Sequence, residues 1–329
     1  RAPRDPAVAV ANRGAAARAG MNTSSAGVTR LRFVQAEPTG ARRRRRRLSI
    51  DASGEELLGN LYTLGYFSAQ VCLGTPGRRF DVIVDTGSAL TAIACAGCSH
   101  CGSHRHAHGS NQRFDQAASS SDLTLQCSAP PRGMRCRNCD DGKCGYSVSY
   151  TEGSRISGHM VSDYAWFARM DGGGGRAQAR ASFGCQTYES GLFYSQVADG
   201  IAGFSQSQSY GPTLFDSLRS ALNVPDVFSM CLDNVVGAMV LGGSVRAERA
   251  GALRWIPYTG SGSYVVALGD IKIDGHSIGV PSSTYRTSIV DSGTSFTYLP
   301  PAAYAKVKDY WLNGARCPWG ACASRTQKG

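Results

Sequence analysis

Two short motifs of the same pattern, far apart in the chain, constrain the fold most. Asp85-Thr86-Gly87-Ser88 follows the apolar run Val82-Ile83-Val84, and Asp291-Ser292-Gly293-Thr294 follows Ser288-Ile289-Val290. Each pattern is typical of a buried strand that ends in an acid, followed by a hydroxyl residue and a glycine that permits a sharp turn. If the two turns face each other, one carboxyl group from each motif arrives at the same place.

Two such carboxyl groups, roughly 3 Å apart, cannot both be ionised, so the pair shares a proton near neutral pH or below. The ionised Asp can take a proton from water, and the protonated Asp can donate one to a carbonyl oxygen. This is the chemistry of peptide hydrolysis without a covalent intermediate. The alternative is two unrelated strand-to-turn junctions. Two copies about two hundred residues apart, each after an apolar strand, favour a paired site of Asp85 and Asp291.

Composition sets wider limits on the chain. Its 329 residues, 42% apolar and 18% charged, suit one large domain or two of ordinary size. The net charge of +11 says little about a partner, because much of it lies in the first fifty residues. No apolar stretch approaches the length of about eighteen residues that a membrane span needs. The chain begins with Arg1 and shows no apolar signal core, so we expect a fragment without its true N-terminus.

Residues 1–60 are rich in Arg and Ala and include the run Arg42 to Arg47. Like charges in such a run repel one another, so we expect a disordered, solvated segment. The functional alternatives are a pro-segment, a cleavage site for a basic-specific protease, or a nucleic-acid contact. We expect no nucleic-acid partner, because no aromatic or fold motif accompanies the charge.

Twelve cysteines, seven of them between Cys95 and Cys144, indicate disulfides and an oxidising compartment. The Cys-x-x-Cys-x-x-Cys spacing and four interleaved histidines also suit zinc. So many cysteines favour disulfides, and we expect no metal and no cofactor. Seven is an odd number, so at least one of these cysteines pairs outside the insert or stays unpaired. Cys72 is a candidate partner.

Short alternating runs separated by turns predict a mostly β chain. One hairpin over residues 66–84 leads to Asp85, and another carries Tyr150 and Glu152 at its tip. The further predicted elements are strands over 181–185, 227–232, 238–243, 264–268 and 271–273, an apolar-apolar-Gly step within 199–204, and helices over 213–222 and from Pro300 onward.

From about residue 66 to 310, these motifs together resemble the pepsin-like aspartic proteases. The matching pieces are Leu73-Gly74-Thr75-Pro76, the two Asp motifs, the hairpin from Tyr150, Gly200-Ile201-Ala202-Gly203 and Leu241-Gly242-Gly243. The resemblance implies a bilobal β fold with one catalytic Asp in each lobe and a flap over the cleft. Asp85 and Asp291 would form the dyad. Ser88 and Thr294 would orient it, and Tyr150 would be the flap tyrosine.

A narrower resemblance involves the insert over 95–144, which is similar to the nepenthesin-type insert. The segments 149–158, 184–185 and 192–196 resemble the plasmepsin V group, endoplasmic-reticulum proteases of apicomplexan parasites that process exported proteins after Arg-x-Leu. In that group a flap acid and a glutamine near the cleft recognise the substrate arginine. The matching residues here are Glu152 and Gln196. A carboxylate facing a guanidinium is a sound specificity device, and a solvated turn residue is the alternative for Glu152.

The resemblance also implies a domain division. We expect an N-terminal lobe over 61–210 and an incomplete C-terminal lobe over 211–329. Only about forty residues follow Thr294, and a second apolar-apolar-Gly step that would support Asp291 is missing. We therefore expect the chain as given to be inactive, although its parent gene product is an enzyme. The membrane helix that ends the relatives would follow the last residue of this chain.

The leading functional prediction is a monomeric aspartic endopeptidase of the endoplasmic reticulum that acts on polypeptides with an Arg before the cut. One alternative is a broad-specificity nepenthesin-type protease, secreted or vacuolar. Another is a non-catalytic binding protein on the same fold. Glu152 favours the first, and the two intact motifs disfavour the last because such proteins usually lose a catalytic Asp or the adjacent Gly.

Overall fold

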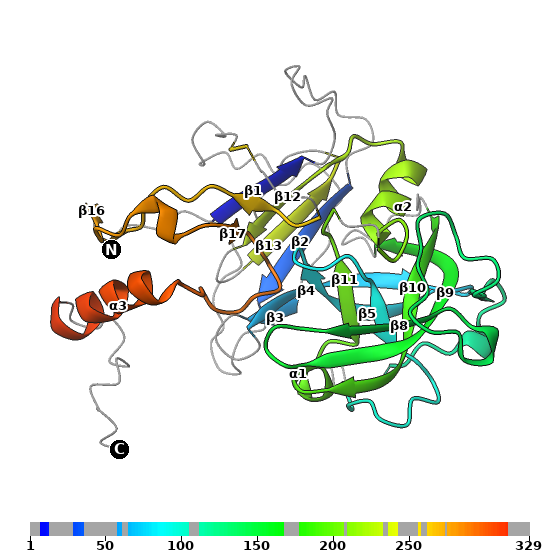
Figure 1. Cartoon of the computed structure of the whole chain (residues 1–329). Coiled ribbons are helices and arrows are strands. Elements are labelled where there is room, and N and C mark those ends of the chain that lie inside the picture. The colour runs from blue at the N-terminus through cyan, green and yellow to red at the C-terminus, as the bar shows by residue number, and fades with distance from the viewer. Residues whose placement is uncertain are drawn as a thin grey trace, which may run out of the picture.

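A computed structural model of the chain describes residues 7–12, 29–35, 58–60, 65–104, 112–167, 178–206, 209–232, 236–242, 256–257, 262–273 and 275–314. These residues are mostly β, as predicted, and most strands belong to one sheet (Figure 1). The order of that sheet is β1-β12-β13-β2-β3-β4-β5-β11-β6-β10-β9-β7, with β8 paired to β9. Two small sheets, β14-β17 and β15-β16, lie in the C-terminal part.

The large sheet consists of β1 (Ala7–Asn12), β2 (Thr29–Gln35), β3 (Leu58–Asn60), β4 (Tyr66–Leu73), β5 (Arg78–Asp85), β6 (Ala92–Ala94), β7 (Leu123–Thr124), β8 (Gly145–Ser149), β9 (Arg155–Phe167), β10 (Ala179–Ser190), β11 (Gly200–Gly203), β12 (Val227–Leu232) and β13 (Val236–Leu241). The remaining strands and the α-helices are β14 (Val265–Val266), β15 (Lys272–Ile273), β16 (His276–Ser277), β17 (Ser288–Ile289), α1 (Leu192–Ser195), α2 (Leu214–Leu222) and α3 (Pro301–Asp309).

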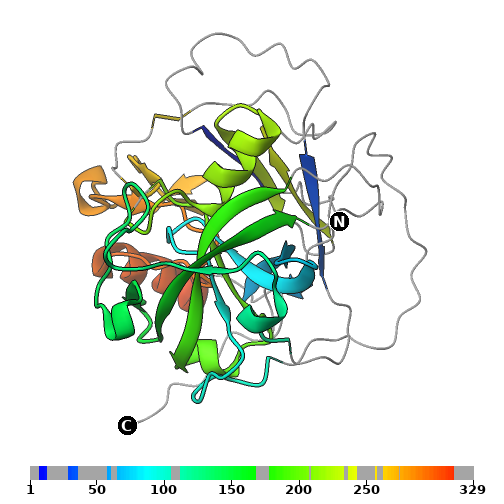
Figure 2. The same ribbon diagram turned by 90° about the vertical axis from the view of Figure 1, so that its right-hand side faces the viewer.

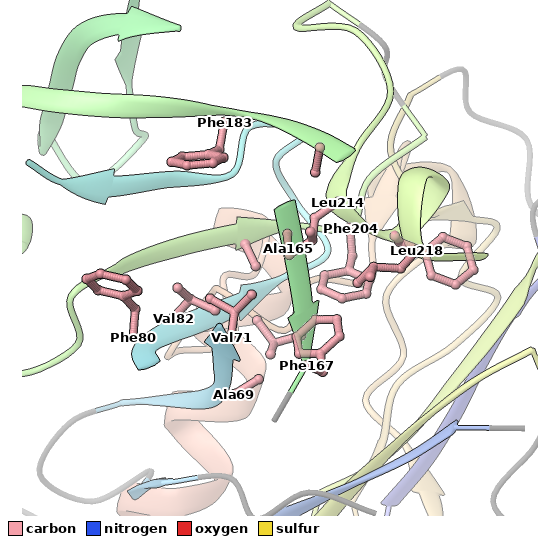
Figure 3. Close-up of a cluster of buried hydrophobic side chains, with 14 of the residues drawn as sticks. Ala69, Val71, Phe80, Val82, Ala165, Phe167, Phe183, Phe204, Leu214 and Leu218 are labelled. Carbon is pink, nitrogen blue, oxygen red and sulfur yellow. The ribbon is translucent and has the colours of Figure 1, made fainter. Parts of the chain in front are cut away.

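Strand β5 lies between two hydrophobic cores because successive side chains of a strand point to opposite faces. Val82 and Val84 belong to a cluster with Phe183 and Phe204 (Figure 3), and Ile83 belongs to a second cluster. Both valines are fully buried. The continuous β-branched run is therefore typical of a strand covered on both faces. It fixes the place where Asp85 leaves the core.

Helix α2 confirms the prediction for residues 213–222. Thr213 is its N-cap and forms a capping box with Asp216, and Asn223 ends the helix in the left-handed conformation. The buried side chains of α2 are Leu214, Phe215 and Leu218. Figure 2 shows the helix beside the green strands β9 and β10. The four-residue helix α1 was not predicted, because it is too short to show a helical period.

The N-terminal segment departs from the sequence prediction. Three strands lie within residues 1–60: β1 pairs antiparallel with β12, β2 pairs antiparallel with β13, and β2 pairs parallel with β3. The expectation of disorder is therefore wrong for these three stretches, which complete the backbone hydrogen bonds of β12, β13 and β4. Arg42 to Arg47 lie outside the described residues. The average composition of the segment concealed its short alternating runs.

The predicted lobe boundary falls inside the large sheet, since β12 and β13 pair with strands that lead to β4 and β5. The division at residue 210 stays a prediction. Residues 262–273 and 275–314, orange to red in Figure 1, lie to one side of this sheet. Across the described ranges, no helix combines the length and apolar character that a membrane crossing requires.

Four disulfides join all seven cysteines of the insert and one outside it. The pairs are Cys95–Cys185, Cys98–Cys101, Cys127–Cys139 and Cys136–Cys144. The partner outside the insert is thus Cys185 in β10. The suggestion of Cys72 was wrong, because that residue packs against Trp166 instead. The choice of disulfides over zinc for these cysteines is supported, since Cys98 and Cys101 are bonded to each other.

Phe204 gives a direct test of the core. Its fully buried ring contacts those of Phe167, Phe215 and Phe228. We expect Phe204→Ala to lower the free energy of unfolding by about 3–5 kcal/mol, because it leaves a cavity. Leu123→Ala, at a side chain that is 56% exposed, should change it by less than about 0.5 kcal/mol. Urea unfolding measures both, and equal small losses would contradict this description of the core.

Candidate active site

Asp85 is held at the end of β5 by the adjacent strand β11. The two strands are parallel, with Gly203 opposite Asp85. The backbone N–H of Phe204 donates to the Asp85 carbonyl oxygen at 2.7 Å, and that of Ser205 donates to the Ser88 carbonyl at 2.9 Å. A Cβ at Gly203 would lie 2.6 Å from the Ser88 carbonyl oxygen, so only glycine permits this approach. The Ile201-Ala202-Gly203 step therefore supports Asp85, as the resemblance implied.

Asp291 follows a shorter strand. β17 pairs antiparallel with β14, and the Val290 N–H donates to the Tyr264 carbonyl oxygen at 2.9 Å. Tyr264 also joins this segment to the core, because its hydroxyl donates to the Phe204 carbonyl at 2.8 Å. The backbone of Phe204 thus links the two segments, because its N–H binds the Asp85 carbonyl and its carbonyl binds Tyr264, which in turn binds Val290 next to Asp291.

The two Asp motifs also bind each other through their hydroxyl residues. The Thr86 N–H donates to Ser292 Oγ at 3.2 Å, and the Ser292 N–H donates to Thr86 Oγ1 at 2.9 Å. Each hydroxyl then donates to the strand opposite: Thr86 Oγ1 to the Val290 carbonyl at 3.3 Å, and Ser292 Oγ to the Val84 carbonyl at 2.6 Å. This reciprocal pairing across 206 residues brings the two carboxyl groups together.

Each carboxyl group is oriented by its own motif. Asp85 accepts from the Gly87 N–H at 2.8 Å and from Ser88 Oγ at 2.5 Å. Asp291 accepts from the Gly293 N–H at 2.8 Å and from Thr294 Oγ1 at 2.6 Å. Ser88 and Thr294 thus each donate to the acid of their own motif, and their orienting role in catalysis stays a prediction.

The glycines show how closely the motifs face each other. A Cβ at Gly87 would lie 2.4 Å from Asp291 Oδ2, and a Cβ at Gly293 would lie 2.4 Å from Asp85 Oδ1. Each carboxylate thus lies over the glycine of the opposite motif, where any larger residue would collide with it. The glycine of each motif is therefore required by the acid of the opposite motif.

The environment of Asp85 favours its neutral form. Burial, and next the negative charge of Asp291, raise the pKa of Asp85 from 3.8 to about 7. Hydrogen bonds from Ser88 and Gly87 oppose this rise because they stabilise the ionised form. Near neutral pH, the pair therefore holds a proton that an exposed carboxyl group would have released. An acid and a base are then available at one place.

Tyr150 lies at the tip of the hairpin formed by β8 and β9, and its pKa is raised by burial and by the charge of Asp85. Its ring packs against Phe193 of α1, with ring centroids 4.9 Å apart. The Tyr150 N–H donates to the Ser154 carbonyl at 2.9 Å, which closes the turn. Tyr150 therefore lies within reach of the charge of Asp85, and its role as the flap tyrosine stays a prediction.

Glu152 and Gln196 are the two residues that were predicted to contact a substrate arginine. Glu152 is exposed in the same turn as Tyr150, and its charge acts on that tyrosine. Gln196 follows α1, and its Nε2 donates to the Ala198 carbonyl at 3.2 Å. Their predicted contact with a substrate arginine stays a prediction.

Thr86, Ser292 and Phe193 complete the site but were not among the predicted site residues. A hydroxyl residue in each Asp motif was the available signal for the first two, whereas no local pattern identifies Phe193. A cavity of about 460 Å³ lies on the hairpin away from the dyad, lined by Lys143, His159 and others. Neither Asp85 nor Asp291 lines it, so it does not represent their substrate site.

The fold and the dyad geometry define a class. Residues 67–243 match the protein family described as xylanase inhibitor N-terminal, a pepsin-like domain, and this match covers more than half of the chain. The chain belongs to the pepsin-like aspartic proteases.

Among individual proteins, it is similar to Aspartic protease 5 of Toxoplasma gondii, with 26% identity over 299 residues, covering 74% of this chain and 30% of the relative. It is 30% identical to Plasmepsin V of Plasmodium falciparum (isolate 3D7) over 197 residues, 59% of this chain and 32% of the relative. It is 28% identical to Aspartic proteinase nepenthesin-2 of Nepenthes gracilis over 269 residues, 77% of this chain and 57% of the relative. The chain thus spans about a third of the length of the first two relatives.

Two substitutions should move the pKa of Asp85 in opposite directions. Asp291→Asn removes the neighbouring charge and should lower the pKa from about 7, although burial keeps it above 3.8. Ser88→Ala removes a hydrogen bond to the ionised form and should raise the pKa further. Titration of the Asp85 carboxyl carbon by NMR measures both shifts. Shifts of the same sign in the two variants would contradict the assigned causes.

The raised pKa should also affect stability. Folded Asp85 keeps a proton that the unfolded chain loses above about pH 4. Its contribution to the free energy of unfolding therefore decreases as the pH rises from about 4 to about 7. Asp85→Asn removes this contribution, and its unfolding free energy should fall less over that range than that of the wild type. Urea unfolding at several pH values measures the difference. Identical pH dependence in both proteins would refute it.

Proposed function

We propose that this protein is an aspartic endopeptidase that hydrolyses peptide bonds with water activated by Asp85 and Asp291. The observation that carries the proposal is the reciprocal pairing of the two Asp motifs, which places each carboxylate over the other's glycine. The raised pKa of Asp85 agrees with a pair that shares one proton. The chain spans only part of its relatives, so the activity is proposed for the gene product as a whole.

In the proposed reaction, the ionised acid of the pair removes a proton from water, and the oxygen attacks the substrate carbonyl carbon. The protonated acid donates its proton to the carbonyl oxygen, which gives a tetrahedral diol. The acid that took the proton from water then donates it to the amide nitrogen, the other acid takes a proton from one hydroxyl of the diol, and the C–N bond breaks to give a carboxylic acid and an amine. Ser88 and Thr294 each hold the Oδ2 atom of the neighbouring acid during these steps, and Tyr150 covers the site.

For the substrate, we propose secretory or exported proteins with an Arg-x-Leu-like sequence before the cut. An exposed carboxylate at Glu152, in the turn after Tyr150, supports this because it can pair with a guanidinium. Gln196 would add a second polar contact to the arginine. The similarity to Plasmepsin V and Aspartic protease 5 agrees with this choice. The four disulfides suit the oxidising secretory pathway, and we propose the endoplasmic reticulum as the site of action.

A non-catalytic binding protein is the second candidate, favoured by the xylanase inhibitor description of the matching family. The two candidates differ in what Asp85 must do. A binding protein has no need of a shared proton, whereas a protease loses its activity with either acid. Cleavage that disappears in Asp85→Asn, and pepstatin binding that disappears with it, would identify the protease.

Selectivity for arginine tests the substrate proposal. Purified full-length protein should cleave an Arg-x-Leu peptide at least about tenfold faster than its Lys-x-Leu twin, since a carboxylate binds the planar guanidinium through two hydrogen bonds. In Glu152→Gln this preference should fall to about twofold or less. The ratio of kcat/KM for the two peptides is the measurement.

The matched control is Asp141→Asn, which neutralises an exposed acid outside the flap turn and should keep the preference. Asp85→Asn is the blank for contaminating proteases. Equal cleavage of both peptides by the wild type would favour the broad-specificity alternative. Cleavage of neither would favour the binding protein.

A further inference from the structure

Glu189 is a charged residue inside the protein that the proposed chemistry does not use. It lies near the end of β10, and both its side chain and that of His104 are completely buried. The His104 Nε2 atom lies 2.9 Å from Oε2 and 3.1 Å from Oε1 of Glu189. A carboxylate only accepts, so this nitrogen carries the hydrogen and donates it. The Gly102 N–H donates a further hydrogen bond to Oε2 at 2.9 Å.

The backbone of Glu189 is held by the same loop. Its N–H donates to the His100 carbonyl at 2.8 Å, and its own carbonyl accepts from His100 Nδ1 at 2.8 Å. Residues 98–104, called the insert loop below, therefore bind Glu189 through three of their members. The disulfide Cys98–Cys101 closes this loop.

A buried carboxylate is unfavourable without partners, and removing one partner of such a pair leaves the other charge uncompensated. The five hydrogen-bonding contacts to Glu189 therefore fix the end of β10 against the insert loop. The loop also touches α1 directly, since a Cβ at Gly102 would lie 1.9 Å from the Tyr194 carbonyl oxygen.

The end of β10 in turn contacts the hairpin of β8 and β9 that carries Tyr150 at its tip, called the flap hairpin below. Glu189 pairs with Ile156, and the next residue, Ser190, pairs with Arg155 at the start of β9. Two residues further on, the Leu192 N–H donates to the buried Ser154 Oγ at 2.9 Å, which ties α1 to the base of the flap turn. The following residue of α1 is Phe193, whose ring packs on Tyr150.

The flap turn itself has little to hold it. Thr151, Glu152 and Gly153 are exposed, and the described backbone bonds of the turn run between Tyr150, Gly153 and Ser154. Contacts at its base therefore decide where Tyr150 lies relative to the dyad.

We propose that Glu189 is a positioning residue for the flap, through which the insert loop sets the place of α1 and Tyr150 over the dyad. The positioning of Tyr150 can be tested without catalysis, although its consequence for cleavage rests on the proposed function. The insert thereby becomes part of the substrate-binding apparatus.

Hydrogen exchange of the flap amides is the test. The Tyr150 and Gly153 N–H groups are hydrogen-bonded within the turn, so their exchange reports how firmly the flap is held. In Glu189→Gln and in His104→Leu, these amides should exchange about tenfold faster than in the wild type. His104→Gln keeps an N–H donor near the position of Nε2 and should restore most of the protection.

The control is Asp216→Ala, which removes the side-chain acceptor of the α2 capping box and belongs to neither the flap, α1 nor the insert loop. It should lower overall stability without a selective effect on the flap amides. Should Glu189→Gln fail to fold, the comparison of His104→Leu with His104→Gln still decides. Unchanged flap exchange in folded Glu189→Gln, or equal exchange in the two His104 variants, would overturn the proposal.

Cleavage kinetics separate this inference from the proposed function. If the protein is a protease, the Glu189 and His104→Leu variants should raise KM for the peptide substrate more than they lower kcat. Absence of cleavage in the wild type would remove the proposed function, while the exchange measurements would still support or overturn the positioning role. Normal kinetics with altered exchange would limit Glu189 to flap mobility and contradict its effect on substrate binding.

Discussion

The reciprocal hydrogen bonds between Thr86 and Ser292 hold this site together, because the two acids come from strands in separate sheets. Each hydroxyl accepts from the opposite backbone N–H and donates to the opposite strand, so four groups are satisfied by two side chains. Both partners of each hydroxyl belong to the other motif or to the strand before it. The pairing therefore forms only when the two Asp motifs lie against each other. This pairing determines the positions of the two carboxyl groups. Each carboxyl group is fixed by the glycine and hydroxyl of its own motif, and each lies against the glycine of the other motif.

Burial then determines the chemistry. Strand β5 is covered by hydrophobic clusters on both faces, and Asp85 stands where this covered strand ends. Loss of solvation is the largest cause of its raised pKa, ahead of the charge of Asp291. The same packing that stabilises the sheet therefore disfavours the ionised acid, and the folded protein gives up some stability near neutral pH to keep a proton at the site.

Disulfides fix the insert at the edge of the site. Cys95–Cys185 ties the insert to β10, and Cys98–Cys101 closes the loop that surrounds Glu189. This buried acid lies between the insert and the flap hairpin, so a segment of irregular structure acquires a fixed place relative to Tyr150. Sequence reasoning recognised the insert and its oxidising chemistry but could not pair Cys95 with Cys185, which is 90 residues away.

The sequence by itself determined the strands that lead to both acids, the α2 helix with its cap, and the identities of Asp85, Asp291, Ser88, Thr294 and Tyr150 as candidate site residues. The strands, the helix and the two acids depend on local patterns, such as β-branched runs, turn glycines and capping residues, whose meaning does not need distant contacts. Ser88, Thr294 and Tyr150 became candidates through the resemblance to the pepsin-like proteases. Only the tertiary structure decided how the parts meet. It showed that strands β1 and β2 complete the sheet, that Phe193 packs against Tyr150, and that His104 and Glu189 form a buried pair. Each of these depends on burial and on partners far along the chain, and both are created by folding itself.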